Sequence, residues 1–399
     1  MAKDINPPRG MRDFLPADKG KRENALAVIR GVYESYGFQE IETPALENLD
    51  RLLSGQGGDN EKLAYRVMKR GAELEEAISG GSDADALADL GLRFDLTVPL
   101  TRFYATNRTS LPSVFKAVQI GPVWRAERPQ KGRYRQFIQC DIDIIGDDGI
   151  LAEAELITAS LAALDALGLK DSLIRVNHRE LLISLLTGFG INSENLSKAM
   201  IIIDKLDKLE VSGVIQELKD NLGDQVANEA EKWFDSLNTS EIPEILSDMF
   251  QVIGSQRLKF DPTLVRGMGY YTGVIFEIEH PGSGLSIGGG GRYDGMVGKW
   301  LGADVPAVGI SLGFERVIEL IAGGYQSSGV VLVLEDDSIE VLNHALELQR
   351  ELIEQKLNVR LELKPKRLNL LLENMKANGF NRFALISSDG AKPELKYID

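Results

Sequence analysis

The chain contains a single cysteine, Cys140, and only three histidines among 399 residues. One cysteine excludes an intrachain disulfide framework and is typical of a reducing compartment, so we expect a cytoplasmic protein. The histidines, His178, His280 and His344, stand far apart, and no spacing of histidine and cysteine matches a zinc site.

Basic residues and long apolar runs are also scarce. The chain carries 45 Lys and Arg against 60 Asp and Glu, a formal net charge of −15. Overall charge therefore disfavours nucleic-acid binding, which would have to depend on local basic clusters. No apolar run approaches the roughly 18–20 residues that span a bilayer. Residues 1–8 have no apolar signal-peptide core, so we expect no membrane partner.

One dense basic cluster stands out against this acidic background. Its only acid is Glu127, and its five cations are Arg125, Arg128, Lys131, Arg133 and Arg135. The cluster leads into residues 136–145, where side chains alternate as in a strand. Gln139 and Asp143 share one face of that strand, and Cys140 points to the other, which predicts a core position for the thiol. An exposed sheet face is the alternative interpretation, but unmixed cations beside it favour a site for polyphosphate and a polar ligand.

Three further segments carry polar, charged or glycine residues that would be energetically unfavourable if they served only to build the fold. Asp95 and Thr97 stand two apart, so on a strand they would share a face and could receive an ammonium group; a solvated strand end is the alternative. Residues 265–273 combine three glycines with Arg266 and the pair Tyr270 and Tyr271, although a structural turn with a surface arginine would also fit.

The third of these segments is the glycine run of residues 288–291, followed by residues 306–316. A glycine-rich strand permits close approach of a flat ligand. Arg316 begins a predicted helix after a strand, which is a suitable place for a nucleotide. Neither the Walker phosphate loop nor the dinucleotide fingerprint is present, so ATP binding would need a different nucleotide fold.

Residue patterns divide the chain into three parts. Residues 114–145 predict two antiparallel strands joined by the basic cluster, and residues 153–167 predict a helix. Residues 192–256 are predicted to be almost entirely helical, because charged and aliphatic residues recur there at i, i+3 and i+4 spacing. After the glycine-rich residues 323–329, strand and helix patterns alternate, as in an α/β domain with a parallel or mixed sheet. We expect a β-rich core of residues 1–190 and 257–322, a helical insertion of residues 191–256, and an α/β domain of residues 329–399.

Local signals refine this outline. Residues 21–36 predict an amphipathic helix that Gly37 ends, and residues 38–44 predict a short strand. Residues 71–91, rich in Gly, Ala, Asp and Glu, predict a mobile surface insertion. A further strand is predicted at residues 285–287.

These segments, in this order, resemble the histidyl-tRNA synthetase family of class II aminoacyl-tRNA synthetases. The similarity runs from residue 7 to about residue 390, and several long motifs in one order are far more specific than one short fingerprint. The matching segments are Pro8–Pro16 (the N-terminal signature), Tyr36–Pro44 (motif 1), Arg125–Asp143 (motif 2 in its histidine-specific form), Arg266–Gly273 and Gly288–Gly295 (the histidine peptides), and Ala307–Arg316 (motif 3).

The resemblance implies an α+β fold: a six-stranded antiparallel catalytic sheet flanked by helices, a helical insertion, and a C-terminal α/β anticodon-binding domain. It also implies activation of L-histidine by ATP with Mg²⁺, transfer to tRNA(His), and a homodimer formed through motif 1.

Residue roles carry over from the family where the motifs match. The resemblance implies that histidine is bound by Asp95, Thr97, Arg125, Gln139, Asp143, Arg266, Tyr270 and Tyr271. Catalysis is implied for Arg125 and Arg266, and ATP binding for Arg125, Glu127, Arg133 and Arg316. Contacts with the tRNA acceptor end are implied for Arg128 and Gln130. The Mg²⁺ ligands cannot be assigned from the sequence, and Glu315 is the only candidate.

The sequence departs from the family pattern at three places. Gly269 stands where the family often has Asp, residues 72–90 resemble an inserted acidic loop, and the chain stops at Asp399, which we interpret as a shortened C-terminal domain. Two alternatives follow from the residues. One is the histidine-binding regulatory subunit of ATP phosphoribosyltransferase, opposed by Arg266 and the intact motif 2. The other is a synthetase for another amino acid, opposed by the tyrosine pair together with Asp143.

Overall fold

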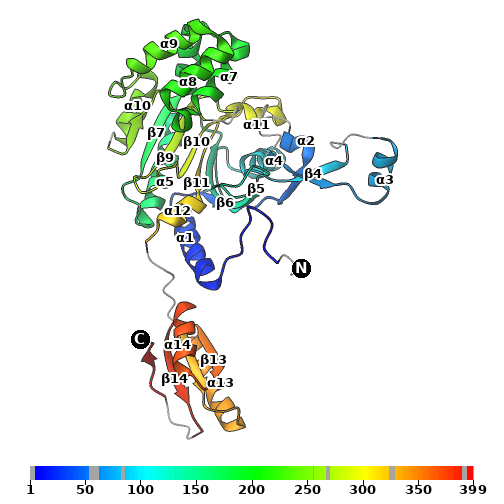
Figure 1. The fold of residues 1–399 in the computed structure, drawn as a ribbon, viewed down its shortest axis with the longest axis vertical. Coiled ribbons are helices and arrows are strands. Elements are labelled where there is room, and N and C mark those ends of the chain that lie inside the picture. Colours follow the sequence, from blue (N-terminus) through cyan, green and yellow to red (C-terminus); the bar gives the residue numbers. More distant parts are fainter. Residues whose placement is uncertain are drawn as a thin grey trace. The chain divides into compact units, whose positions relative to one another are not determined.

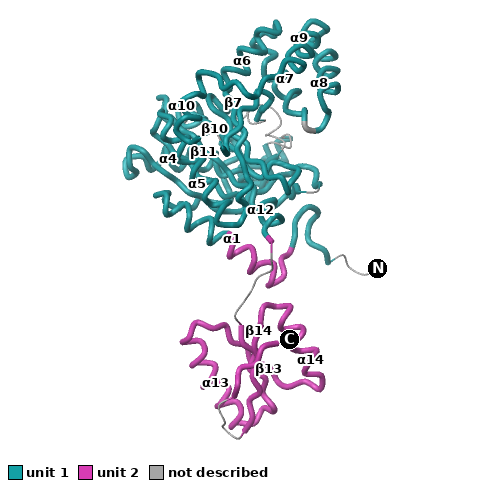
Figure 2. Tube along the Cα trace, turned by 90° about the vertical axis from the view of Figure 1, so that its left-hand side faces the viewer, with its two compact units in different colours: residues 1–12, 26–321 teal, residues 13–25, 322–399 magenta. Residues whose placement is uncertain are grey.

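The computed structural model describes residues 5–53, 63–81, 86–130, 132–254, 256–266, 270–322, 329–388 and 393–398. The chain divides into two compact units (Figure 2). The first comprises residues 1–12 and 26–321, and the second comprises residues 13–25 and 322–399. The finer division into core, insertion and C-terminal domain stays a prediction.

An eight-stranded sheet forms the centre of the first unit (Figure 1). Its strand order is β1 (Gln39–Glu40), β5 (Phe115–Trp124), β6 (Gln136–Ile145), β11 (Ala307–Gly313), β10 (Gly288–Arg292), β9 (Val274–Glu279), β7 (Leu173–His178) and β8 (Leu258–Phe260). The six strands from β5 to β7 in this order are all antiparallel to their neighbours, which confirms the predicted six-stranded sheet. The short strands β1 and β8 pair in parallel at its two edges and make the whole sheet mixed.

Helices cover this sheet and extend the unit at one end. Helix α5 (Ile150–Ala166) packs on β6 and β11 with alanine and leucine side chains, so one face of the sheet is sealed by a helix. Helices α6 (Arg179–Gly188), α7 (Ser193–Ile203), α8 (Leu206–Leu222), α9 (Asp224–Asp235) and α10 (Glu244–Ile253) supply the helical texture predicted for residues 192–256. The remaining helices near the sheet are α4 (Thr97–Asn107), η2 (Arg108–Ser110), α11 (Asp294–Leu301) and α12 (Phe314–Leu320).

Two strand predictions near the sheet were wrong. The strand predicted at residues 38–44 is reduced to the two residues of β1. The strand predicted at residues 285–287 begins instead at Gly288, so the glycine run is itself strand β10. Pairing with β9 and β11 on both sides overrides the low strand propensity of glycine.

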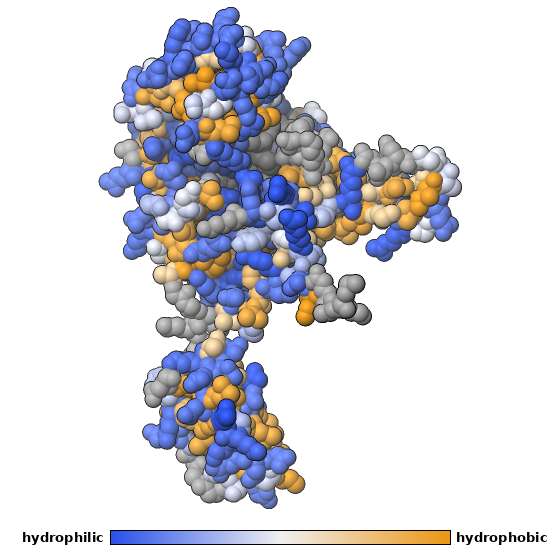
Figure 3. All heavy atoms as spheres, viewed as in Figure 1, coloured by the Kyte–Doolittle hydropathy of each residue, from blue (hydrophilic) through white to orange (hydrophobic). Residues whose placement is uncertain are grey.

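A second, three-stranded sheet projects from the first unit (Figure 1). Its strands lie in the order β2 (Leu46–Asn48), β4 (Ala88–Leu92) and β3 (Tyr65–Met68), accompanied by α2 (Leu49–Leu53) and α3 (Gly71–Ser79). The loop predicted for residues 72–90 is therefore wrong in its described part, because its Ala, Glu and Leu residues form a helix. No side chain of α3 is buried, so the surface position is confirmed. Apolar atoms gather on this projection (Figure 3), where Leu46, Met68 and Ile78 are exposed.

Helix α1 (Pro16–Ser35) covers the helix predicted for residues 21–36 except its last residue, and begins five residues earlier. It ends two residues before Gly37, whose φ of +82° is a left-handed conformation that glycine adopts without strain. The amide of Phe38 donates to the Tyr33 carbonyl across this turn. Gly37 therefore terminates the helix, as predicted.

The second unit contains the predicted alternation of strands and helices. Its elements are β12 (Gly329–Leu334), α13 (Ile339–Glu354), β13 (Val359–Leu363), α14 (Leu368–Ala377), β14 (Phe380–Ile386) and β15 (Lys396–Tyr397). The sheet order is β13-β12-β14-β15, with β12 parallel to both neighbours and β15 antiparallel. Alternate side chains of β12 face the two helices, Leu332 toward α13 and Val333 toward α14. The mixed α/β sheet predicted here is confirmed. Among the described residues, no helix is both long and apolar enough to cross a membrane.

Candidate functional site

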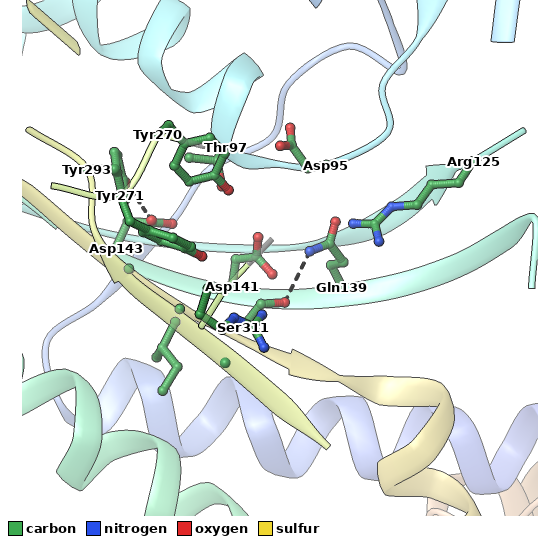
Figure 4. A pocket seen from close by; sticks show the side chains of 15 residues that line it. Asp95, Thr97, Arg125, Gln139, Asp141, Asp143, Tyr270, Tyr271, Tyr293 and Ser311 are labelled. Carbon is green, nitrogen blue, oxygen red and sulfur yellow. Dashed lines mark hydrogen bonds between the residues drawn. The ribbon is translucent and has the colours of Figure 1, made fainter. Parts of the chain in front are cut away.

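A polar cavity of about 120 Å³ lies on the face of the large sheet formed by β6, β10 and β11 (Figure 4). We call it the site cavity. Its lining comes from these three strands, from Asp95 and Thr97 at the start of α4, and from the segment before β9. Arg125, just after β5, and Tyr293, just after β10, complete it. The lining residues are Asp95, Thr97, Arg125, Gln139, Asp141, Asp143, Arg266, Tyr270, Tyr271, Gly289, Gly290, Tyr293, Gly309, Ile310 and Ser311.

All eight residues predicted to bind histidine line this one cavity. They come from four separate stretches of sequence, which the sheet brings together. The structure thus supports the grouping.

Strand β6 contributes a row of polar side chains from alternate positions. Gln139, Asp141 and Asp143 line the cavity, while Cys140 and Ile142 are completely buried on the opposite face. The core position predicted for Cys140 is confirmed. The amide Nε2 of Gln139 donates to the Oγ of Ser311 at 3.2 Å, and its own oxygen has no hydrogen-bond partner in the described structure.

Asp95 and Thr97 reach the cavity from a different element than predicted. Strand β4 ends at Leu92, and Thr97 is the first residue of α4, so the two residues do not share a strand face. Asp95 Oδ1 instead accepts a hydrogen bond of 3.1 Å from the amide of Val98 in the first turn of α4. Its Oδ2 has no partner among the described residues and is buried.

The floor of the cavity is made of glycine backbone, which leaves room for other side chains to lie against the sheet. A Cβ built on Gly289 would come within 2.7 Å of the Phe276 carbonyl oxygen and 2.8 Å of Nη1 of Arg266. One built on Gly291 would come within 2.7 Å of the Val274 carbonyl oxygen and 2.8 Å of the Tyr271 ring. A side chain at either position would displace the backbone of β9 as well as the group that packs on the glycine. The glycine run is therefore required by what packs on it.

Gly309 on β11 likewise leaves room for the side chain of Asp143, the residue opposite it on β6. A Cβ at Gly309 would lie only 1.9 Å from Oδ1 of Asp143. That oxygen accepts a 2.6 Å hydrogen bond from the hydroxyl of Tyr293, while Oδ2 has no partner in the described structure. One oxygen of the carboxylate is thus fixed by a hydrogen bond, and the other could accept a hydrogen bond from a ligand.

Burial raises the pKa of all three cavity carboxyls. The pKa of Asp143 is raised to about 7, chiefly by desolvation, against which the Tyr293 hydrogen bond acts. The pKa of Asp95 is raised to about 6 by desolvation, while the Val98 amide and the Arg125 cation lower it. The pKa of Asp141 is raised well above its usual value by desolvation and then by the neighbouring Asp143. A cationic ligand would relieve this cost by supplying the missing opposite charge.

Two arginines, Arg125 and Arg266, line the same cavity as these three carboxyl groups. Nη1 of Arg266 donates to Oε2 of Glu277 at 3.0 Å. Burial acts to lower the pKa of Arg266, but Tyr271 and Glu277 outweigh it and the pKa is raised. Nε of Arg125 donates to the Phe94 carbonyl at 3.0 Å. Both guanidinium groups are therefore anchored on one side.

The residues predicted to bind ATP apart from Arg125, and those predicted to contact tRNA, are not in the cavity lining. They lie on the loop between β5 and β6 or on α12. Arg133 and Glu127 approach within 3.6 Å, and Gln130 and Arg133 form a tight turn through reciprocal backbone hydrogen bonds. Arg316 donates to the backbone carbonyls of Gly132 and Ser286. Arg128 lies on the same loop, and Lys131 and Gly269 lie outside the described residues.

Glu315, the only metal candidate from the sequence, is already paired. Its Oε2 accepts from Arg12, and its Oε1 accepts from the amide of Ile138 at 3.2 Å. The Arg12 guanidinium also stacks 3.4 Å from the centre of the Tyr134 ring. Among the described residues, no group of three or more His, Cys, Asp or Glu side chains is arranged to hold a metal ion. Glu315 and the other described carboxylates are therefore not arranged to bind a permanently held Mg²⁺.

Sequence reasoning missed three lining residues with polar side chains: Asp141, Tyr293 and Ser311. Asp141 shares the spacing of Gln139 and Asp143, so the strand pattern could have identified it. The other two follow from the pairing of β11 with β6 and from the position of α11, which no local pattern specifies.

Comparison with known proteins gives consistent matches. Residues 10–317 match the family described as histidyl-tRNA synthetase. The chain is 50% identical over 419 aligned positions to the histidine–tRNA ligase of Leifsonia xyli subsp. xyli (strain CTCB07), covering 98% of this chain and 97% of that protein. Among solved structures, the histidyl-tRNA synthetase of Nostoc sp. PCC 7120 has a TM-score of 0.76 at 27% identity, covering 99% of this chain and 95% of that one. A Bacillus halodurans structure titled as an ATP phosphoribosyltransferase regulatory subunit/histidyl-tRNA synthetase shares the fold, with a TM-score of 0.71 at 22% identity over 93% of this chain and 96% of that one.

Proposed function

The chain belongs to the histidyl-tRNA synthetase family, and we propose that it activates histidine in the site cavity. It is a histidine–tRNA ligase, which joins L-histidine to tRNA(His) at the expense of ATP. In the first step an oxygen of the histidine carboxylate attacks the α-phosphorus of ATP. The bond between the α-phosphorus and the bridging oxygen breaks, and pyrophosphate leaves. In the second step a hydroxyl of the tRNA 3′ end attacks the histidyl carbonyl, and AMP leaves.

One observation carries the assignment of the cavity: buried polar atoms without partners converge on it. They are Oδ2 of Asp95, Oε1 of Gln139, Oδ1 of Asp141, Oδ2 of Asp143 and Nε of Arg266. Unpaired buried polar atoms are costly, so a ligand that satisfies them gains affinity that an apolar ligand cannot. Histidine offers an ammonium group, a ring with an N–H donor, and a carboxylate.

We assign the ammonium end to Asp95, Thr97 and Gln139. Asp95 and Gln139 lie on the side of the cavity toward Arg125 (Figure 4). An ammonium group supplies three donors, and Asp95 and Gln139 each offer an oxygen that has no partner in the described structure. Ionisation of Asp95, unfavourable in the buried cavity by itself, becomes favourable beside this cation.

We assign the imidazole ring to the other side, where Asp143, Tyr270 and Tyr271 lie (Figure 4). The free oxygen of Asp143 would accept the ring N–H, and Tyr270 would wall the ring above the glycine floor. The cavity would reject a residue with an apolar side chain, because Asp143 would then stay buried and unpaired.

We assign the reacting atoms to the space between Arg125 and Arg266. The histidine carboxylate is already a nucleophile, so adenylation needs no general base. Catalysis then consists of positioning and of stabilising the charge on the α-phosphate. Arg125 would hold the carboxylate and the α-phosphate, and Arg266 would neutralise charge in the transition state. Loss of such a fixed charge costs on the order of 10²–10³ in rate.

The remaining ATP contacts would come from Glu127, Arg133 and Arg316 beside the cavity. Arg316 would bind the γ-phosphate, because its guanidinium is anchored by backbone carbonyls and remains cationic. Mg²⁺ would enter as part of its complex with ATP, where phosphate oxygens and water supply most ligands. Glu315, whose oxygens accept from Arg12 and the amide of Ile138, would not be a metal ligand.

The tRNA acceptor end would approach the loop between β5 and β6, where Arg128 and Gln130 are located. Arg128 is exposed there, and Arg125, Arg133 and Arg135 are half-buried beside it, so the loop would provide the local positive surface that an acidic protein needs to bind phosphate. The anticodon would bind the α/β domain of residues 329–399. We also propose a cytoplasmic homodimer formed through residues 36–44. The exposed apolar side chains of the adjoining small sheet, Leu46 and Met68, support a protein interface in this region.

The decisive experiment is histidine-dependent ATP–pyrophosphate exchange. We expect exchange with histidine and magnesium in the wild type, and its near loss in Arg266→Ala, while histidine binding measured by calorimetry persists. Arg257→Ala is the matched control, because Arg257 is also a partly buried arginine bonded to a carboxylate, Asp165, away from the cavity. It should retain exchange.

Absence of exchange in the wild type would favour the regulatory alternative, in which histidine binds but no adenylate forms. Charging of tRNA(His) would then separate the two steps: exchange without charging would place the defect in tRNA binding.

A further inference from the structure

Arg266 is held from outside the cavity by a row of alternating charges. Its Nη1 donates to Oε2 of Glu277 at 3.0 Å. The other oxygen of Glu277 accepts from Nη1 of Arg175 at 2.9 Å, and Nε of Arg175 donates to Asp261 at 2.6 Å. Side-chain exposures of 24%, 14%, 16% and 11% for Arg266, Glu277, Arg175 and Asp261 leave the row largely shielded from water. We call these four residues the arginine row.

The arginine row is built on rigid strands. Arg175 on β7 and Glu277 on β9 are direct partners in the antiparallel register. Asp261 follows β8, and its Oδ1 accepts from both the amide and the hydroxyl of Thr263, at 2.9 and 2.6 Å. Glu277, Arg175 and Asp261 are thus each fixed by more than one bond. Charge-assisted bonds between groups on a sheet hold a side chain more precisely than a loop can.

The residues that follow Arg266 in the sequence give a further reason why Arg266 needs a partner such as Glu277. Arg266 is followed three residues later by Gly269, where the family often has Asp. Glycine has no side chain with which to orient a guanidinium. The cavity itself contains unpartnered oxygens of Asp95, Asp141 and Asp143, which compete for any cation free to move. Glu277, which is not in the cavity lining, gives Arg266 a fixed partner on the outer side.

A small second cavity, of about 40 Å³, lies beside the arginine row. It is lined by Arg175, Asp204, Thr263 and Glu277 together with aliphatic side chains. Because this cavity adjoins Glu277, packing alone does not fix its side chain. Its position depends on the bonds to Arg175 and Arg266.

We propose that Glu277 is a positioning residue for histidine activation, which holds Arg266 toward the α-phosphate, and that Arg175 holds Glu277. The proposal rests on the function proposed above for Arg266. Glu277 touches no substrate in this arrangement and acts only through the guanidinium that it orients. Its loss should slow the chemical step and leave the histidine contacts of the cavity intact.

The first test replaces Glu277 by its neutral isostere. In Glu277→Gln we expect kcat for exchange to fall about 10- to 100-fold, the range of one lost charge-assisted bond. KM for histidine should change less than threefold. Glu277→Asp keeps the charge but is one methylene too short, so it should recover little of the rate. Arg175→Lys, which keeps the charge but loses the fork geometry, should give a smaller fall in kcat.

Glu279→Gln is the matched control. Glu279 lies on the same strand, undergoes the same change and also approaches Arg175, at 3.9 Å, but it has no bond to Arg266. Its exchange rate should remain within twofold of wild type. Circular dichroism and thermal melts should show that all variants are folded. Should Glu277→Gln fail to fold, Arg175→Lys carries the test by the same KM and kcat criteria.

A double-mutant cycle with Arg266→Lys decides whether Glu277 acts through Arg266. If it does, Glu277→Gln will cost far less in the Arg266→Lys background than in the wild type. Equal losses in both backgrounds, or a loss expressed in KM for histidine, would overturn the proposal. Full activity of Arg266→Lys and Arg266→Ala would instead refute the proposed function of Arg266 itself, so the two failures are distinguishable.

Discussion

Replacing Gly309 by alanine tests the ring end of the cavity with one methyl group. The added Cβ would lie 1.9 Å from Oδ1 of Asp143, and real Cβ contacts stay beyond 3.0 Å, so the carboxylate must move by about 1.1 Å, the difference between these distances. The movement breaks the 2.6 Å bond from Tyr293. The φ of Gly309 is not in the left-handed region, so alanine is compatible with the backbone itself.

The displaced carboxylate can no longer meet the imidazole ring. Losing a hydrogen bond to a charged group costs about 1.5–3 kcal/mol, which corresponds to a rise in KM for histidine of roughly 10- to 150-fold. Histidine-dependent exchange across a range of histidine concentrations measures this directly, and KM for ATP should stay near the wild-type value.

Gly188→Ala is the matched control for this change. Gly188 ends helix α6, and a Cβ there would meet nothing within 4 Å. Its kinetics should equal those of the wild type. A folded Gly309→Ala protein with an unchanged KM for histidine would refute the role of Asp143, because the carboxylate cannot remain in place beside the new methyl group.

Three further outcomes follow from the structure. The folded pKa of Asp143, about 7, exceeds the usual 3.8, so the stability that its bound proton gives is lost as pH rises from about 4 to 7. Asp143→Asn should therefore stabilise the ligand-free protein by about 4 kcal/mol at pH 8 but by only about 2 kcal/mol at pH 5. Thermal melts at both pH values check this, and equal shifts would contradict it. Glu153→Gln removes the buried partner of Arg292, bonded at 2.7 Å, and should lower the unfolding free energy in urea by about 3 kcal/mol, whereas a change below about 0.5 kcal/mol would show that the pair is not stabilising. Gly291→Ala brings a methyl group within 2.8 Å of the Tyr271 ring and should weaken histidine binding in calorimetry, which an unchanged affinity would exclude.

The sequence predicted the cavity best where its residues follow a local period. Gln139 and Asp143 were placed together because alternate residues of a strand share a face, and the same rule sent Cys140 into the core. Asp141 obeys the rule as well, but a third buried carboxylate has no partner that the sequence could reveal. Its surroundings come from strands that are distant along the chain.

Other parts of the site depended on tertiary structure. Asp95 and Thr97 reach the cavity as predicted, but from the start of a helix, because β4 ends at Leu92. Arg316 lies outside the cavity lining, because it is on α12 and its guanidinium is bonded to the carbonyls of Gly132 and Ser286. Glu277 gave no signal, as its role depends on a register between β7 and β9 that no motif encodes.

The glycine floor of the cavity has a consequence for the entropy of binding. A floor of side chains would have to give up rotamer freedom when a ring settles on it, whereas a glycine strand has no rotamers to lose. The cost is met earlier, on folding, because each glycine in a strand destabilises it by roughly 0.5–1 kcal/mol relative to alanine. With four consecutive glycines in β10, Gly288 to Gly291, the protein gives up conformational stability in the empty state and gains a rigid surface that is ready for its ligand.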